Sequence, residues 1–130
     1  MTKYLIGIDA GNTSSKAVIF DDTGKVVAAA ATKSSERMHL APRGRGFEEF
    51  DVDELWHIVS QCIKQAIEDA GIAPEDIAGI GVTSFGNGVV FLDEKGWSIA
   101  PGCFSQDYRA NDILALYQKD GTYDKINRIV

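Results

Sequence analysis

The fold class is decided by residues 4–31, YLIGIDAGNTSSKAVIFDDTGKVVAAAA. Three runs rich in apolar residues, 4–8, 16–20 and 26–31, are separated by two segments of turn-forming residues, DAGNTSS and DDTGK. Short apolar runs bounded by Gly, Asp, Asn and Ser are typical of β-strands joined by tight turns. The stretch therefore predicts two successive hairpins, which together form a three-stranded antiparallel meander.

A long amphipathic helix is predicted between Asp51 and Gly71. Asp51 can cap its first turn, and Glu54 stands three residues later as the capping-box partner. Cys62 lies on the apolar stripe, so we expect a buried core thiol, whereas His57 lies off it and is expected on the helix surface. The apolar stripe follows helical spacing at Leu55, Ile58, Val59, Cys62, Ile63, Ala66, Ile67 and Ala70.

The second half of the chain continues with alternating elements. The run IAGIGV (77–82) is typical of a strand that is buried on both faces of a parallel sheet. TSFGNG (83–88) interrupts the apolar pattern, and residues 89–92 predict a further strand. A second helix is expected over about residues 109–119 and stops at Gly121. Helices packed on a mixed sheet, an α/β class, fit this order of elements best.

Composition narrows the classes of function. The 130 residues, 14.1 kDa, suffice for one compact domain. Thirteen Lys and Arg against nineteen Asp and Glu give a net charge of −6, which is unfavourable for binding the phosphate backbone of a nucleic acid. We expect no nucleic-acid partner, and no membrane partner because no apolar stretch approaches the ~20 residues needed to cross a bilayer.

The two cysteines and the N-terminal sequence indicate in which cellular compartment the protein is expected. Cys62 and Cys103 are too few for a disulfide scaffold and lack the spacing of metal ligands. The N-terminal sequence MTKYLIGID has no feature of a targeting segment. Two reduced thiols in a cytoplasmic protein are therefore expected.

The segment GIDAGNTSSK (7–16) is the first candidate for chemistry. Asp9 ends an apolar strand, and small Gly, Ser and Thr residues follow it. Backbone N–H groups and hydroxyls of such a turn can converge on a phosphate, since no large side chain blocks the approach. A carboxylate at the strand end can hold hydrated Mg²⁺ against phosphate oxygens. The alternative is a plain hairpin whose turn requires glycine.

Four segments, in this order and at these separations, resemble known proteins. YLIGIDAGNTSSKAVIFDDTGKVVA (4–28) is similar to the opening hairpins of the actin-like, sugar kinase and heat-shock ATPase superfamily. GFEEFDVDELW (46–56) resembles the G-W-x-E-x-D-x-x-x-x-W stretch of the FGGY carbohydrate kinases. IAGIGVTSFGNGVVFLDEKG (77–96) resembles their strand, substrate loop and strand, and PGCFSQDYRAND (101–112) stands where they carry W-x-D-x-R.

The resemblance implies an RNase H-like fold and ATP-dependent phosphorylation of a sugar or polyol hydroxyl, with ATP and Mg²⁺ as cofactors. A pentulose such as xylulose is favoured, because the helix start and the substrate loop look closest to L-xylulose kinases. It also implies that residues 1–130 are the front part of the family's N-terminal domain and that the catalytic aspartate lies beyond Val130. Such a fragment is expected to be inactive, and its uncovered sheet is expected to favour self-association or a homodimer.

Site roles carried over from the family fall in two groups. Asp9 matches the aspartate associated with Mg²⁺, and Lys16 matches a basic position often present near it. Asn12 departs from the family's more common threonine. The residues that match the loop facing the ATP phosphates are Gly11, Asn12, Thr13 and Ser14.

The second group concerns the sugar. Asn87 matches a polar position that contacts sugar hydroxyls, while Asp107 and Arg109 match the acid and base of W-x-D-x-R, with Ser105 in place of the tryptophan. An alternative for Asp107 and Arg109 is a structural ion pair at a helix start. The expected substrate-binding set is Gly86, Asn87, Gln106, Asp107 and Arg109.

Two other classes compete with the kinase. A small RNase H-like nuclease, such as a Holliday-junction resolvase, also opens with a strand, D-x-G and a hairpin, but needs several converging carboxylates and a basic surface. A non-catalytic binding module is the third reading. Among the remaining residues, Trp56 and Trp97 are expected as core or interface aromatics, and a solvated loop rather than a phosphate clamp is expected for Arg37, Arg43 and Arg45.

Overall fold

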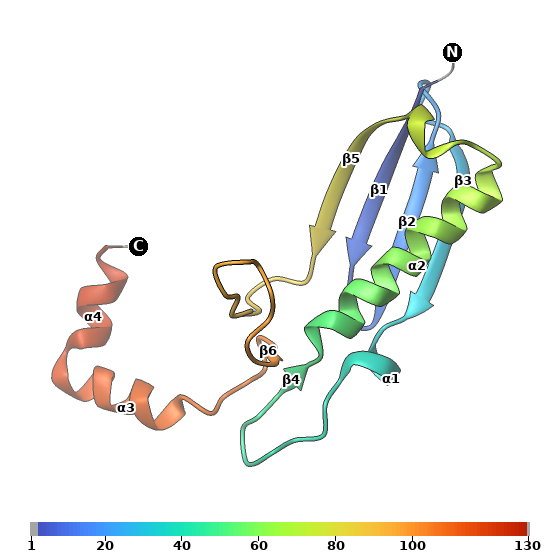
Figure 1. The fold of residues 1–130 in the computed structure, drawn as a ribbon. Coiled ribbons are helices and arrows are strands. Elements are labelled where there is room, and N and C mark those ends of the chain that lie inside the picture. The colour runs from blue at the N-terminus through green and yellow to red at the C-terminus, as the bar shows by residue number, and fades with distance from the viewer. Residues whose placement is uncertain (1–2, 130) are drawn as a thin grey trace.

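The computed structural model describes residues 3–129 and contains a four-stranded mixed sheet (Figure 1). Strands β1 (Tyr4–Ala10), β2 (Ser14–Phe20) and β3 (Val26–Lys33) form the predicted antiparallel meander. Strand β5 (Ile77–Ser84) pairs with β1 in parallel, which gives the order β3-β2-β1-β5. The α/β class and the mixed sheet are therefore confirmed.

Helix α2 (Val52–Ala70) covers one face of the sheet and contacts mainly β2 and β3 (Figure 1). Side chains alternate between the two faces of a strand, so every second residue of β1 and β2 points at the helix. This arrangement buries the predicted apolar stripe, including Cys62, and leaves His57 exposed as expected. The buried residues between α2 and the sheet are Ile6, Ile8, Ala17, Ile19, Val59, Cys62 and Ala66.

The ends of α2 follow the sequence signals, with one exception. The Asp51 carboxylate accepts a hydrogen bond from the Glu54 N–H at 2.9 Å, and Gly71 ends the helix in the left-handed region at φ 64°. The reciprocal half of the capping box does not form. The Glu54 carboxylate pairs with Arg37 at 2.6 Å instead, and the Asp51 N–H donates to the Met38 carbonyl.

A second, smaller packing unit lies beyond the carboxyl ends of β1 and β5. It contains α1 (Ser35–Met38) and the two-residue strands β4 (Glu49–Phe50) and β6 (Gly102–Cys103), which pair antiparallel. Its buried side chains are Met38, Phe50, Ile58 and Phe104. Pro42, Gly44 and Gly46 break any periodicity in residues 32–50, so the sequence predicts an irregular segment there. That prediction is wrong for α1 and β4, because this apolar cluster fixes them.

The middle of the chain differs from two predictions. Residues 89–92 are not a strand of the sheet but part of an irregular hairpin, with isolated bridges from Val89 to Cys103 and from Leu92 to Ser98. Strand β5, which follows a short 3-10 turn (Pro74–Asp76), is not buried on both faces, since α2 lies over β1 to β3 and β5 is an edge strand. Ile80 and Val82 are accordingly 67% and 70% exposed.

The C-terminal part forms two short helices, α3 (Asn111–Asp120) and α4 (Thr122–Asn127), which extend away from the sheet (Figure 1). The predicted helix over 109–119 is confirmed, but it starts two residues later, so that Arg109 lies in the preceding loop. Gly121 ends it with φ 77°, as expected. Trp56 and Trp97 are 70% and 68% exposed, which makes a core role for either side chain wrong.

Candidate functional site

The predicted phosphate turn is a tight hairpin of three residues, Gly11–Thr13, between β1 and β2. A Cβ on residue 11 would lie 2.3 Å from the Ser14 carbonyl oxygen, so only glycine fits there. Thr13 is exposed, while Gly11, Asn12 and Ser14 are half-buried. The turn and the following Ser14 therefore lie at least partly open to solvent at the end of β1.

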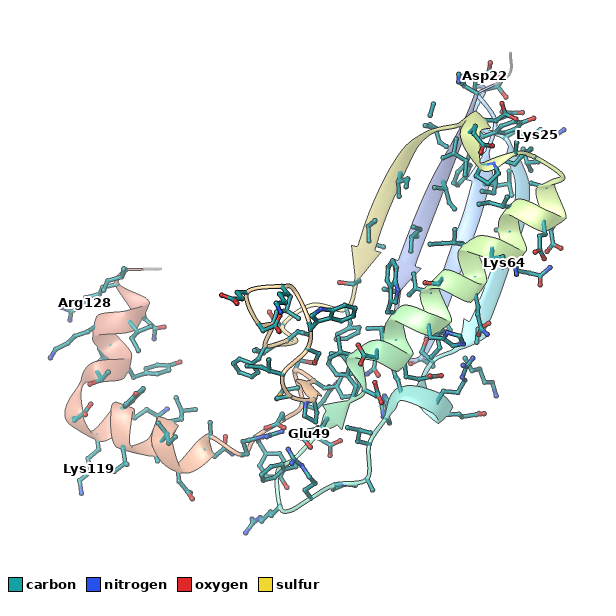
Figure 2. All side chains as sticks on the ribbon, viewed as in Figure 1. Asp22, Lys25, Glu49, Lys64, Lys119 and Arg128 are labelled. Carbon is teal, nitrogen blue, oxygen red and sulfur yellow. The ribbon has the colours of Figure 1, made fainter. Side chains whose placement is uncertain are left out.

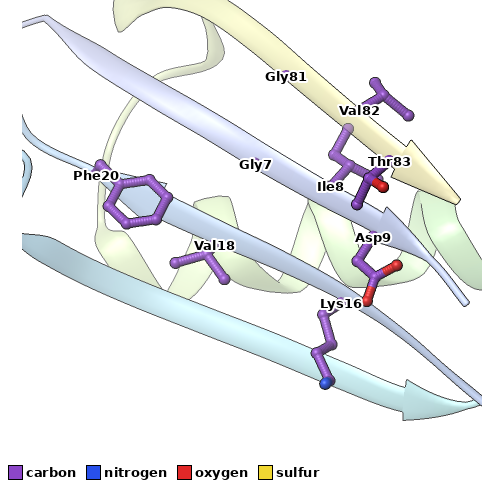
Figure 3. Close-up of a pocket in the computed structure, with 9 residues that line it drawn as sticks. All are labelled: Gly7, Ile8, Asp9, Lys16, Val18, Phe20, Gly81, Val82 and Thr83. Atoms are coloured by element: carbon purple, nitrogen blue, oxygen red, sulfur yellow. The ribbon is translucent and has the colours of Figure 1, made fainter.

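Asp9 and Lys16 lie side by side on the face of the sheet opposite α2, because they are register partners in the β1–β2 ladder (Figure 3). On the other side of Asp9, Thr83 of β5 is its parallel partner. Within residues 3–129, no ion pair or side-chain hydrogen bond engages the Asp9 carboxylate, which leaves its oxygens available. The three side chains line an open pocket of about 420 Å³ together with Gly7, Ile8, Val18, Phe20, Gly81 and Val82.

The segment around α1 holds the phosphate turn from the side. The Ser34 N–H donates to the Thr13 carbonyl at 2.9 Å, and the Ser15 and Ser34 hydroxyls, both fully buried, lie 2.9 Å apart. The His39 ring nitrogen Nε2 lies 2.6 Å from Oδ1 of Asn12. One backbone hydrogen bond and two side-chain contacts thus hold the turn in place. Ser34 and His39, which make these contacts, come from the segment 32–50 that the sequence predicts as irregular.

The predicted substrate loop leaves the sheet beside the phosphate turn. It follows β5, whose last residues pair in parallel with Asp9 and Ala10. Parallel strands place their carboxyl ends at one edge of a sheet, where ligands of α/β proteins commonly bind. Asn87 has φ 59°, in the left-handed region that asparagine tolerates better than most residues, and its side chain is exposed.

Asp107 and Arg109 form an ion pair within a larger cluster. The Asp107 carboxylate, 8% exposed, accepts from Arg109 Nε and from the Glu48 N–H, each at 2.9 Å. Arg109 Nη2 also donates to Glu49 at 2.9 Å, and its guanidinium stacks 3.9 Å above the Phe47 ring. The structural ion pair that the sequence left open is thus present.

Glu49 is the central acceptor of this cluster, at the end of the sheet opposite Asp22 and Lys25 (Figure 2). Its side chain is 3% exposed and accepts from Arg43 Nε at 2.8 Å and Nη2 at 2.7 Å. The bonds from Arg43, followed by those from Arg109, hold the pKa of Glu49 below its usual value against the opposing effect of burial. Arg109 likewise lowers the pKa of Asp107 far below its usual range.

The predicted sugar residues are only partly brought together. Phe85 at the start of the substrate loop packs 5.5 Å from Phe104, and the Asp107 N–H donates to the Phe104 carbonyl. The substrate loop and the Asp107 turn therefore both contact Phe104, the loop through the Phe104 ring and the turn through the Phe104 backbone carbonyl. Gly86 and Gln106 are exposed, and the carboxylate of Asp107 is already occupied by Arg109 and Glu48, so direct contact of these residues with a sugar stays a prediction.

Sequence reasoning missed three residues of this region. His39 and Phe47 lie in the irregular segment, where no periodicity points to them. Glu49 lies inside the quoted stretch GFEEFD, but its burial follows only from the pairing of β4 with β6. Of the three arginines expected in a solvated loop, two form ion pairs: Arg37 with Glu54 and Arg43 with Glu49.

A comparison with family models decides the affiliation. Residues 4–130 match the model of the FGGY family of carbohydrate kinases, N-terminal domain. The chain belongs to the FGGY family. The resemblance seen in the four sequence segments is thereby confirmed, and the RNase H-like α/β fold with it.

Individual relatives of this FGGY chain are carbohydrate kinases. It is 34% identical over 123 residues to a probable L-xylulose kinase of Pasteurella multocida, which covers 95% of the chain and 25% of the relative. It is 40% identical over 108 residues to an autoinducer-2 kinase of Escherichia coli, covering 82% of the chain and 20% of the relative. The chain thus spans about a quarter of the length of the curated relatives it matches.

Solved structures show the same fold. The gluconate kinase of Lactobacillus acidophilus superposes with a TM-score of 0.82 at 25% identity, over 98% of this chain and 25% of that one. The xylulose kinase of Rhodospirillum rubrum superposes with a TM-score of 0.76 at 27% identity, over 91% and 23%. None of these similarities favours the nuclease alternative. Among residues 3–129, no helix has the length and apolar character required to span a membrane.

Proposed function

We propose that this chain supplies the phosphate-binding turn and part of the sugar site of an ATP-dependent carbohydrate kinase with a ketopentose such as xylulose as acceptor. The observation that carries the proposal is the shared sheet edge. Asp9 and Thr83 are neighbours in the β1–β5 ladder, so the phosphate turn and the substrate loop start from adjacent strand ends. Phosphoryl transfer requires both ligands to be held next to each other.

The residues at this edge suit Mg²⁺ and ATP. Within residues 3–129 no group of three or more His, Cys, Asp or Glu side chains is placed to hold a metal ion. Asp9 is therefore a lone carboxylate, which fits a hydrated Mg²⁺ that takes its other ligands from water and phosphate oxygens. When bound, Mg²⁺ neutralises charge on the phosphates. Lys16 adds a positive charge beside Asp9, and the backbone N–H groups of Gly11–Thr13 can donate to phosphate oxygens.

The residues of the substrate loop support the proposed sugar site. A polyol presents hydroxyls that both donate and accept, and each buried one needs a partner. Asn87 offers both functions between two glycines, and it is exposed at the loop surface. The relatives named for L-xylulose and the neighbours named for xylulose favour a ketopentose among the possible acceptors.

The nuclease alternative finds less support. A two-metal nuclease needs converging carboxylates, whereas the acids of this region are committed to arginine partners, as in Glu49 and Asp107. A net charge of −6 also disfavours a nucleic-acid substrate.

The test uses the complete kinase, by which we mean a protein that carries this chain together with the remaining family domains. ADP formation is measured with D-xylulose, L-xylulose, ribulose, gluconate and autoinducer-2 as acceptors. We expect sugar-dependent ADP release with a ketopentose, and none from the 130-residue chain by itself, because the family's catalytic aspartate is expected beyond Val130. Cleavage of branched DNA without any sugar-dependent ADP release would refute the kinase.

A further inference from the structure

His39 connects the phosphate turn to the aromatic cluster. Its Nε2 lies 2.6 Å from Oδ1 of Asn12, and its ring centroid lies 4.5 Å from that of Phe104 at an interplanar angle of 46°. Asn12 is in the turn and Phe104 is buried under the substrate loop. His39 thus contacts both, although it comes from neither.

The Asn12 contact fixes where the hydrogen lies. An amide oxygen has no hydrogen to give, so Nε2 of His39 must carry the hydrogen and donate it to Oδ1. The oxygen end of the Asn12 amide is then occupied. Within residues 3–129 no hydrogen bond engages the other end, Nδ2, whose two N–H groups remain free to donate.

An asparagine amide has two orientations, related by a half-turn, and they differ in electrostatic effect. One presents N–H groups to an anion in the turn, and the other presents an oxygen that would repel it. The contact between Nε2 of His39 and Oδ1 of Asn12 holds the first orientation as long as Nε2 carries the hydrogen. Threonine, the more common residue of the family at this position, needs no such partner because its hydroxyl rotates to suit.

We infer that His39 is a positioning residue: it orients the Asn12 amide so that Nδ2 donates to a phosphate of ATP. The inference rests on the proposed function, since it assigns a partner to the phosphate turn.

His39 is itself held in place, as such a role requires. The Leu40 N–H donates to the Glu49 carbonyl at 3.1 Å, and residues 39 and 50 form a β-bridge. Phe104, 4% exposed, packs against the His39 ring in a tilted contact. Because backbone and ring are fixed before any ligand arrives, little conformational entropy remains to be lost when Asn12 binds an anion.

The experiment is an NMR titration of the 130-residue chain with MgATP, which follows the side-chain amide signals of Asn12 and the backbone amides of the turn. Three variants separate the hydrogen bond from the ring contact. His39→Ala removes both, His39→Phe keeps an aromatic ring without a donor, and His39→Gln restores an N–H donor. His57→Ala is the matched control, because His57 is the other histidine and lies exposed on α2.

We expect His39→Ala and His39→Phe to weaken MgATP binding about fivefold, the loss of roughly one oriented hydrogen bond, and to abolish the shift of the Asn12 side-chain amide. His39→Gln should restore both, and His57→Ala should change neither. Unchanged affinity and an unchanged Asn12 shift in His39→Phe would overturn the inference while leaving the kinase intact. A wild-type chain whose turn shows no response to millimolar MgATP would overturn the inference together with the proposed nucleotide site.

Discussion

Removal of the charge at Glu49 by Glu49→Gln should destabilise the fold by about 2 kcal/mol at neutral pH. The side chain is 3% exposed and accepts three hydrogen bonds from two arginines. Loss of one partner of a buried pair costs ~3–5 kcal/mol when the other charge stays buried. Arg43 and Arg109 keep 61% and 30% of their side-chain surface exposed, so water can solvate them and the cost is smaller.

The effect should depend on pH with a definite sign. Arg43 and Arg109 lower the pKa of Glu49 in the folded state, so at mildly acidic pH the unfolded chain binds more protons than the folded one. The stabilisation by Glu49 is therefore complete above about pH 5, where an unfolded Glu is ionised, and is lost as the pH falls toward the lowered pKa. The difference between wild type and Glu49→Gln should shrink over the same range.

Urea unfolding of the chain, followed by far-UV circular dichroism between pH 7 and pH 3, measures both effects. Glu48→Gln is the matched control, because Glu48 is exposed and its carboxylate is in none of the ion pairs of residues 3–129. A stability of Glu49→Gln equal to that of the control at pH 7, or a deficit that does not change with pH, would refute this reasoning.

Three further outcomes follow from the same geometry. In the complete kinase, Asn87→Ala and Asp107→Ala should each lower kcat/KM for the sugar by about ten- to two-hundredfold and leave the KM for ATP nearly unchanged; equal effects on both substrates would count against a sugar role. Gly11→Ala forces a Cβ to within 2.3 Å of the Ser14 oxygen and should raise the KM for ATP about tenfold, as steady-state kinetics can check. The 130-residue chain should self-associate in sedimentation through the exposed Ile80 and Val82, and replacement of both by Arg should reduce this; a strictly monomeric wild type would contradict it.

Sequence patterns, each within one short segment, predicted the β-meander and helix α2. The meander followed from three short apolar runs and two turns, and α2 from its apolar stripe with Asp51 and Gly71 at its ends. Each is decided within one continuous segment, residues 4–33 for the meander and 51–71 for α2, where local patterns suffice. The position of Asp9 at the strand end, beside the turn, could be read from the same stretch.

The other parts of the fold and of the candidate site depend on contacts between segments that are distant in the sequence. Two-residue strands such as β4 and β6 have no periodicity, and they exist because Phe50 and Phe104 pack together. Residues 89–92 have strand composition and so predict a sheet strand, but in the structure they belong to a hairpin over 89–99 whose residues pair with each other and with Cys103. His39 reaches Asn12 across 27 positions, a separation that no local pattern can reveal.

The most direct test of the kinase account is the turnover number of Asp9→Asn in the complete kinase, measured with saturating ATP, Mg²⁺ and the ketopentose that the wild type phosphorylates. Asp9 is half-buried on an uncovered face, so the substitution should leave the circular dichroism spectrum and the Tm unchanged. The account predicts that kcat falls about a hundredfold or more, since the carboxylate would no longer hold Mg²⁺ against the phosphates. A kcat near that of the wild type, in a folded protein, would contradict it.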